Sequence, residues 1–147
     1  MTTVKQVLLQ KGDEVWQVSP ETALCEALKL MNEKKIGALM VCQAEKVLGI
    51  FSERDFARTA ACDKVLDMNT HVDELMTEEV YYVDPEKSID DCMALMTEKH
   101  IRHLPVMQNG RLAGLISIGD VVKVIMAEKD ISIHSLENYI MGRDYNQ

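Results

Sequence analysis

Two stretches of this sequence place glycine, serine and aspartate at the same spacing. Residues 49–55 read GIFSERD and residues 114–120 read GLISIGD, so each runs Gly-x-x-Ser-x-x-Asp. A carboxylate at the start of a helix can accept hydrogen bonds from both hydroxyls of a ribose, as acidic residues do in other nucleotide folds. The free N–H groups of a helix N-terminus also favour an anion. Asp55 and Asp120 are placed for such hydrogen bonds.

The same residue types also cap helices. Serine and aspartate are both favoured at the N-cap position, where a side-chain oxygen accepts a hydrogen bond from the first turn. Ser52 and Ser117 stand where such a cap is needed, and they can equally bond a sugar or a phosphate. Taken alone, the motif favours capping slightly over binding. The two roles can also divide between the serine and the aspartate.

The two motifs belong to a repeat that runs through most of the chain. Both aspartates are related by an offset of 65 residues, and the same offset aligns further apolar and proline positions upstream. The aligned segments are 18–20 with 83–85, 30–31 with 95–96, and 36–41 with 101–106. Self-similarity at a fixed offset indicates duplication of one structural unit.

Each copy predicts the same order of elements. An extended piece (15–20; 80–85) ends at a proline, a residue that favours extended geometry before it. An amphipathic helix follows, and then two short apolar runs that form a hairpin. Asn109 and Gly110 suit the positive φ of a tight turn. A second helix begins near each motif aspartate. The unit is β-α-β-β-α, and two copies packed with pseudo-twofold symmetry give an α+β fold.

The first helix of each copy carries one apolar stripe. Its members recur at i, i+3, i+4 and i+7: Leu24, Ala27, Leu28 and Met31, then Ile89, Cys92, Met93 and Met96. We expect the methionines of these stripes to lie in the core, and the cysteines to act as small apolar side chains.

Composition and charge narrow the possible partners and compartment. The chain has 147 residues and a net charge of −8, which argues against a general nucleic-acid or anionic-membrane surface. Its four cysteines form no CxxC pair, no secretory start is visible, and no apolar run approaches the roughly 20 residues of a membrane span. We expect a protein of the reducing cytoplasm.

The remaining segments join or extend the copies. We predict repeats at 4–58 and 72–126, a connector at 59–71, and a C-terminal helical extension at 127–147. The extension places Ile133, Leu136 and Ile140 on one face and ends its helix at Gly142. This stripe needs a partner surface, either on the same chain or on a second subunit, so we expect a homodimer.

The ordered segments resemble a known family. They are KGDEVWQVSP, ALKLMNEKKIGALMV and GIFSERD, followed by MTEEVYYVDP, MALMTEKHIRHLPV and GLISIGDVV. Residues 4–126 are similar to a pair of CBS domains, which form a Bateman module. The resemblance implies a regulatory fold that binds adenosine-containing ligands between its repeats and usually assembles as a dimer of modules. Stand-alone bacterial members, which this chain resembles, are thought to sense ligands for other proteins.

The resemblance also implies which residues share a cleft. One cleft would combine Ser117 and Asp120 with Lys11, Trp16, Ile36, Gly37 and Ala38. The other would combine Ser52, Arg54 and Asp55 with Tyr81, Ile101, Arg102, His103 and Pro105. The apolar corner at Ile36 or Ile101 would sandwich adenine. Cationic or hydrogen-bonding groups for phosphates would come from Lys11, Arg54, Arg102 and His103.

The two copies differ in ways that bear on binding. Arg102 and His103 align with Gly37 and Ala38, so the clefts are not equivalent. We expect the Asp120 cleft to bind better, because Lys11 and Trp16 contribute there. Trp16 either packs under its sheet or stacks on a base, and the sequence favours neither. His100 and His103 lack further ligands at metal-site spacing, so no metal is expected.

The ligand and the partner remain open at this stage. A ribose-plus-adenine cleft accepts AMP, ADP, ATP, NAD or S-adenosylmethionine, and the regulated protein is unidentified. The alternatives to a sensor are a ligand-free interaction module and, with less support, a small enzyme acting on nucleotides. The chain contains no GxSxG, GxxxxGK[ST] or GxGxxG motif, which argues against an enzyme.

Overall fold

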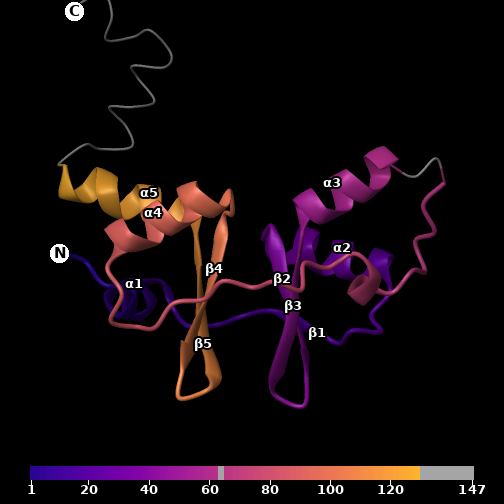
Figure 1. Cartoon of the computed structure of the whole chain (residues 1–147), viewed down its shortest axis with the longest axis horizontal. Helices are drawn as coiled ribbons and strands as arrows, with labels where there is room; N and C mark the ends of the chain where they lie inside the picture. Colours follow the sequence, from indigo (N-terminus) through magenta and orange to yellow (C-terminus); the bar gives the residue numbers. More distant parts are fainter. Residues whose placement is uncertain (63–64, 130–147) are drawn as a thin grey trace, which may run out of the picture.

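Two repeats lie side by side in this protein, each built from a hairpin and two helices (Figure 1). The computed structural model describes residues 1–62 and 65–129. The first repeat contains β1 (Gln17–Val18), α2 (Leu24–Lys34), β2 (Ala38–Gln43), β3 (Lys46–Ser52) and α3 (Glu53–Cys62). The second contains α4 (Ile89–Lys99), β4 (His103–Gln108), β5 (Arg111–Ser117) and α5 (Ile118–Glu128). A helix α1 (Val4–Lys11) and a 3₁₀ turn, η1 (Val72–Glu74), precede them.

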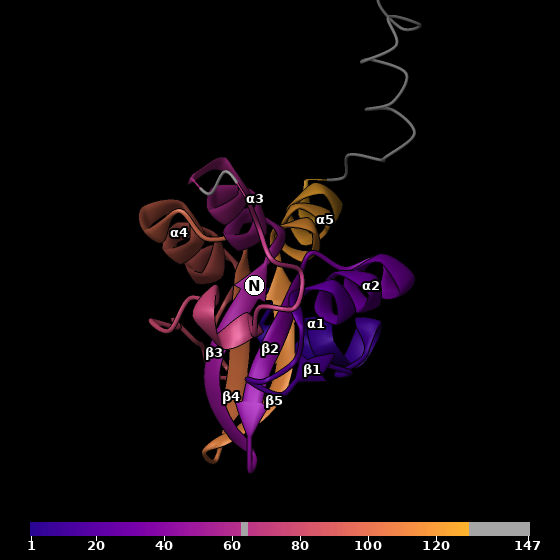
Figure 2. The same ribbon diagram turned by 90° about the vertical axis from the view of Figure 1, so that its right-hand side faces the viewer.

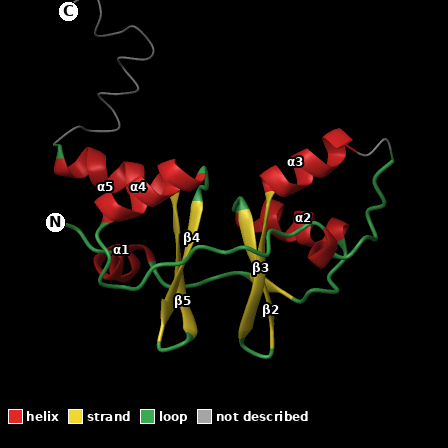
Figure 3. Cartoon of the chain, in the orientation of Figure 1, coloured by secondary structure: helices red, strands yellow, loops and turns green. Residues whose placement is uncertain are grey.

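The two hairpins meet at the centre of the molecule, with helices outside them (Figure 3). β2 pairs antiparallel with β3 and parallel with β1, while β4 pairs antiparallel with β5. Viewed at right angles, the helices gather towards one end of the hairpins (Figure 2). The α+β class is confirmed. Both hairpins also shift register at matching places, after Val41 and after Val106, as a duplication predicts.

The predicted strand at 80–85 is reduced to one bridge, between Val83 and Val106. In the first repeat, the Met40 N–H donates to the Trp16 carbonyl at 3.1 Å and extends the parallel pairing. The residue aligned with Met40 is Pro105, which has no N–H to donate. The parallel edge therefore stops at Val83 in the second repeat.

The hairpin turns use left-handed backbone in both repeats. Asn109 (φ 54°) and Gly110 (φ 75°) form the predicted turn. Ala44 (φ 51°) and Glu45 (φ 64°) adopt the same conformation in the first repeat, where the sequence gives no such signal. A left-handed conformation costs a residue with a Cβ about 1–2 kcal/mol. The first turn is thus held in place by its strands.

Each repeat completes its core with a segment from elsewhere in the chain. Val4 and Val7 of α1, a helix absent from the sequence predictions, are buried in the second repeat's core. Val72 of η1 is buried in the first repeat's core. The segments after α1 and after η1 cross between the repeats in opposite directions (Figure 1). This exchange ties the two repeats together.

The repeated glycines make room for these crossing segments. A Cβ on Gly114 would lie 2.7 Å from both methyl carbons of Leu8 in α1. A Cβ on Gly49 would lie 2.7 Å from the Met76 sulfur and 2.8 Å from the Thr77 carbonyl oxygen. Thr77 also exchanges two backbone hydrogen bonds with Ile50. Glycine leaves room for the other segment at both positions, and at Gly49 that segment's backbone itself makes the close contact.

The helix stripes are confirmed, except at one methionine. Met31 and Met96 are 3% and 2% exposed, as predicted for core residues. Met93 is 39% exposed, so its assignment to the core was wrong. It lies at the exposed edge of the stripe. The predicted helix with Ile133, Leu136 and Ile140 lies outside the described residues.

Candidate functional site

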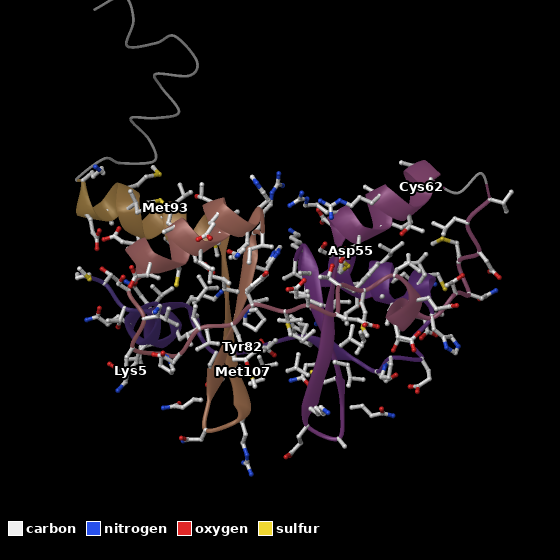
Figure 4. The ribbon with its side chains drawn as sticks, in the orientation of Figure 1. Lys5, Asp55, Cys62, Tyr82, Met93 and Met107 are labelled. Atoms are coloured by element: carbon white, nitrogen blue, oxygen red, sulfur yellow. The ribbon has the colours of Figure 1, made fainter. Side chains whose placement is uncertain are left out.

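Asp55 lies at the start of α3, on the side of its repeat that faces the other repeat (Figure 4). β3 runs directly into α3, so the motif serine ends the strand and the aspartate enters the first helical turn. The Asp55 Oδ2 accepts from the Ser52 N–H at 2.9 Å and from the Ser52 hydroxyl at 3.1 Å. The Asp55 Oδ1 accepts from the Thr77 hydroxyl at 2.9 Å. The carboxylate is buried, with 9% of the residue exposed.

Asp120 occupies the same place at the start of α5 but has a different partner. Its Oδ2 accepts from the Ser117 N–H at 2.8 Å and from the Lys11 Nζ at 2.7 Å. The same ammonium group donates to the Leu115 carbonyl at 2.8 Å. Burial raises the pKa of Asp120, but hydrogen bonds from Lys11 and Ser117 outweigh it and lower the pKa below its ordinary value. Asp120 is therefore held ionised beside Lys11.

The capping role of the Ser-Asp motif is present in both helices. Ser117 caps α5 in a reciprocal capping box with Asp120. In α3, the Asp55 N–H donates to the Ser52 hydroxyl at 3.3 Å, and the Asp55 carboxylate accepts from the Ser52 N–H and hydroxyl. Capping thus fixes each carboxylate in one orientation.

The Asp55 cleft is a cavity of about 390 Å³ between the two repeats. It brings together every residue that the resemblance assigned to it: Ser52, Arg54, Asp55, Tyr81, Ile101, Arg102, His103 and Pro105. Further lining residues include Thr77, Arg58, Lys99 and His100. Thr77 aligns with Gly12, so comparing the two copies gave no signal for it.

The Asp120 cleft is a second cavity, of about 360 Å³. Its walls contain the predicted residues Lys11, Trp16, Ile36, Gly37, Ala38 and Ser117. The predicted Asp120 does not line this cavity itself and reaches it through its ion pair with Lys11. The structure adds Glu14, Lys35 and His103 to the walls.

Trp16 packs against its own repeat and also reaches the Asp120 cleft. Its ring packs against the first repeat's core, and it also lines the Asp120 cleft. The Lys34 ammonium lies 4.3 Å from the ring centroid, within range of a cation–π interaction. Trp16 thus forms a fixed wall of this cleft.

The Asp55 cleft has the larger set of cationic side chains. Arg54, Arg58, Lys99 and Arg102 all line it, together with the carboxylates of Glu53 and Glu79. Arg54 is oriented by a bond from its guanidinium to the His100 carbonyl at 2.8 Å. Arginine can bind a phosphate through two parallel hydrogen bonds. This geometry suits an anionic ligand better than that of the Asp120 cleft.

The part of the chain that the structure describes contains neither a cluster of metal ligands nor a helix suited to span a membrane. Among residues 1–62 and 65–129, no three His, Cys, Asp or Glu side chains gather closely enough to hold a metal ion. Over that part of the chain, no helix combines the length and apolar character needed to cross a membrane. Burial raises the pKa of Cys92 to about 11, consistent with a packing role for this thiol.

Comparison with known proteins identifies the fold family. The family model of the CBS domain matches residues 4–61 and 72–127. CBS domain-containing protein CBSX3, mitochondrial, of Arabidopsis thaliana is 33% identical over 96% of this chain and 73% of its own length. A solved structure of a protein with CBS domains from Burkholderia ambifaria is 46% identical, with a TM-score of 0.84, covering 90% of this chain and 99% of that one.

Two other solved structures contain bound groups. The CBS domain pair of protein MJ0100 was solved in complex with 5-methylthioadenosine and S-adenosyl-L-methionine. It is 21% identical, covers 87% of this chain and 98% of its own, and has a TM-score of 0.76, a likeness of fold. Hypoxic Response Protein I was solved with two coordinated zinc ions. It is 31% identical, covers 84% of this chain and 99% of its own, and has a TM-score of 0.67.

Proposed function

This chain belongs to the CBS-domain family, with two CBS domains in tandem, and on that premise we propose that it is a regulatory sensor of an adenine nucleotide. The observation that carries the proposal is the Asp55 cleft. A fixed, buried carboxylate there shares one cavity with an apolar corner and with several cationic side chains. These are the groups that a ribose, an adenine and a phosphate need.

In the proposed complex, the two repeats hold different parts of the ligand. Asp55 accepts hydrogen bonds from the ribose hydroxyls, in place of or beside its bond from Thr77. Ile101 and Pro105, from the second repeat, cover the adenine ring. The phosphates lie towards Arg54 and Arg102, where guanidinium groups can form paired hydrogen bonds. AMP, ADP, ATP and NAD all contain these parts.

The geometry favours the Asp55 cleft over the Asp120 cleft, contrary to our expectation from the sequence. That expectation relied on Lys11 and Trp16, but the Lys11 ammonium group is already bonded to Asp120 and to the Leu115 carbonyl. A ribose at Asp120 has to displace or share this bond, which weakens binding. The adenosine-containing ligands of the MJ0100 domain pair support the ligand class.

Ligand binding becomes a signal because one ligand contacts both repeats. A nucleotide that joins Asp55 to the Ile101 corner favours one angle between the repeats, provided that it binds two arrangements with different affinity. We propose that the protein acts as a homodimer in the cytoplasm and that an unidentified regulated protein reads the change. Small-angle scattering of the free protein, the AMP complex and the ATP complex tests this, and three superimposable profiles contradict it.

The direct test of binding is thermal denaturation with AMP, ATP, NAD and S-adenosylmethionine. A ligand that binds only the folded state stabilises it by RT ln(1 + [L]/Kd), about 2.7 kcal/mol at 100 times Kd. Titration calorimetry then compares the wild type with Asp55→Ala, Asp120→Ala and the double variant. Each single variant should lose one site, and Asp55→Ala the tighter one. Unchanged affinity in the double variant contradicts a ribose role for both carboxylates.

The same experiment separates the two alternative functions. An interaction module without a ligand gains no stability from any nucleotide in the panel. An enzyme acting on nucleotides converts its substrate during incubation, which chromatography of the nucleotide detects. A sensor returns the nucleotide unchanged and is stabilised by it.

A further inference from the structure

One histidine forms part of the wall of both clefts. His103 is the first residue of β4 and lines the Asp55 cleft and the Asp120 cleft alike. Gly37 also lines both, and two atoms of the His103 ring lie 3.7 Å from the position that a Gly37 Cβ would take. The missing side chain at residue 37 therefore leaves the imidazole between the two cavities.

Charged groups surround this imidazole from several elements. Asp120 of α5, Lys11 of α1 and the adjacent Arg102 all act on it. Glu53 of α3 faces the same gap, since its Cδ lies 3.7 Å from the same Gly37 position. Burial lowers the pKa of His103, Asp120 acts in the opposite direction, and Lys11 and Arg102 lower the pKa further. In the free protein the ring is therefore neutral at pH 7.

We propose that His103 is a positioning residue shared by the two clefts, which takes up a proton when an anionic ligand enters either one and so couples their occupancy. This rests on the proposed function, because it requires a phosphate-bearing ligand. The imidazole gains one proton from the buffer and becomes a cation that attracts the phosphate. A second ligand, in the other cleft, then meets a side chain that is already charged.

A departure from the repeat symmetry leaves a single imidazole for both sites. The residue aligned with His103 is Ala38, which cannot titrate. A symmetric module with a histidine at each position could take up one proton for each ligand. This module has one shared imidazole, so His103 can contribute at most about one proton per chain, however many ligands bind.

The test follows the Cε1–H signal of His103 by NMR as AMP is added, in two variants that each disable one cleft. Asp55→Asn leaves the Asp120 cleft intact, and Asp120→Asn leaves the Asp55 cleft intact. An asparagine oxygen can still cap its helix, so both variants should fold. The His103→Ala spectrum assigns the signal among the four histidines.

In both variants we expect AMP to shift the His103 titration towards higher pH. AMP affinity should also rise on acidification, by no more than tenfold per pH unit. A response in only one variant, with binding measured in both, overturns the shared role. If no variant and no wild-type sample binds AMP, the proposed function itself has failed, and thermal denaturation reports that separately.

Calorimetry provides a second readout that a purely structural role would not change. The AMP binding enthalpy is measured in two buffers of different ionisation enthalpy, and the difference gives the protons taken up. Measured well above the second phosphate pKa of about 6, the AMP phosphate stays fully ionised, so wild type minus His103→Ala isolates the imidazole. His71→Gln is the matched control, because His71 lines neither cavity. Equal proton uptake in the wild type and His103→Ala overturns the proposal.

Discussion

Lys11 and Asp120 form an ion pair of 2.7 Å at a place where the other repeat has no cation. The residue aligned with Lys11 is Met76, which packs beside Gly49. Asp55 instead accepts a hydrogen bond from Thr77, the residue after Met76. One duplicated carboxylate thus forms an ion pair with a lysine, while the other accepts a hydrogen bond from a threonine hydroxyl. This single difference separates the two clefts chemically.

Lys11→Met replaces the lysine by the residue type of the aligned position in the other repeat. It tests how much the ion pair contributes to the free energy of unfolding. About a third of the Lys11 side chain is exposed, so solvent screening limits the loss to below about 1 kcal/mol at pH 7. The pKa of Asp120 is lowered in the folded state, so this contribution is present above its unfolded pKa and is lost as the pH falls through the folded one. In urea denaturation, the difference from wild type should be largest at pH 7 and should shrink as the pH falls below the ordinary aspartate pKa of about 3.9. Lys5→Met, on the same helix, is the control.

An added methyl group should lower the free energy of unfolding by different amounts at the two repeated glycines. In Gly49→Ala the methyl group meets the Thr77 backbone carbonyl, which cannot move without breaking its bonds to Ile50. In Gly114→Ala it meets the flexible end of Leu8. We expect losses of about 2–3 kcal/mol and about 1 kcal/mol respectively by chemical denaturation. Gly119→Ala, with only the Ser117 hydroxyl at 3.6 Å, should cost nothing or stabilise α5. Equal losses at residues 49 and 114 contradict this account.

The sequence predicted the repeated unit well because its signals are local. Stripes such as Leu24 to Met31, and the turn at Asn109 and Gly110, express period and backbone preference within a few residues. It did not predict α1 or its place in the second repeat's core. That exchange depends on contacts between Leu8 and Gly114, which are more than 100 residues apart. Likewise, the family resemblance placed Lys11 in a cleft, but it could not show that Lys11 forms an ion pair with Asp120.

The left-handed turn of the first hairpin offers a stabilising substitution. Glu45 has φ 64° and gains nothing from its side chain there, whereas the aligned residue in the second hairpin is Gly110. Glu45→Gly should raise the unfolding free energy by up to about 1 kcal/mol, since relief of backbone strain exceeds the entropy cost of glycine. Thermal denaturation measures the change. The reciprocal Gly110→Ala should lower stability by a similar amount, and stabilisation by Gly110→Ala contradicts the argument.

Stability should also depend on pH through His103. Its pKa is lower in the folded state than in the unfolded state, so protonation favours unfolding. The wild type should be fully stable above about pH 6.5, the ordinary histidine value, and lose stability as the pH falls from there towards the folded pKa. His103→Asn should flatten this part of the profile. Urea denaturation at several pH values gives the slope of the unfolding free energy with pH. The slopes are compared because the substitution itself also changes the absolute stability.

Arg102 should decide how strongly the Asp55 cleft distinguishes ligands by charge. Arg102 lines this cleft, and the residue aligned with it in the first repeat is Gly37. Arg102→Gly therefore removes the guanidinium group and gives the second repeat the residue that the first repeat has at this position. A charge-assisted bond to phosphate contributes about 1.5–3 kcal/mol, so ATP affinity should fall by about 10- to 100-fold. Adenosine, which has no phosphate, should bind as it does to the wild type. Titration calorimetry with adenosine, AMP and ATP measures the series, with Arg111→Gly as a control outside both cavities. Equal losses for adenosine and ATP indicate that Arg102 holds the corner of the cleft, and place the phosphates elsewhere.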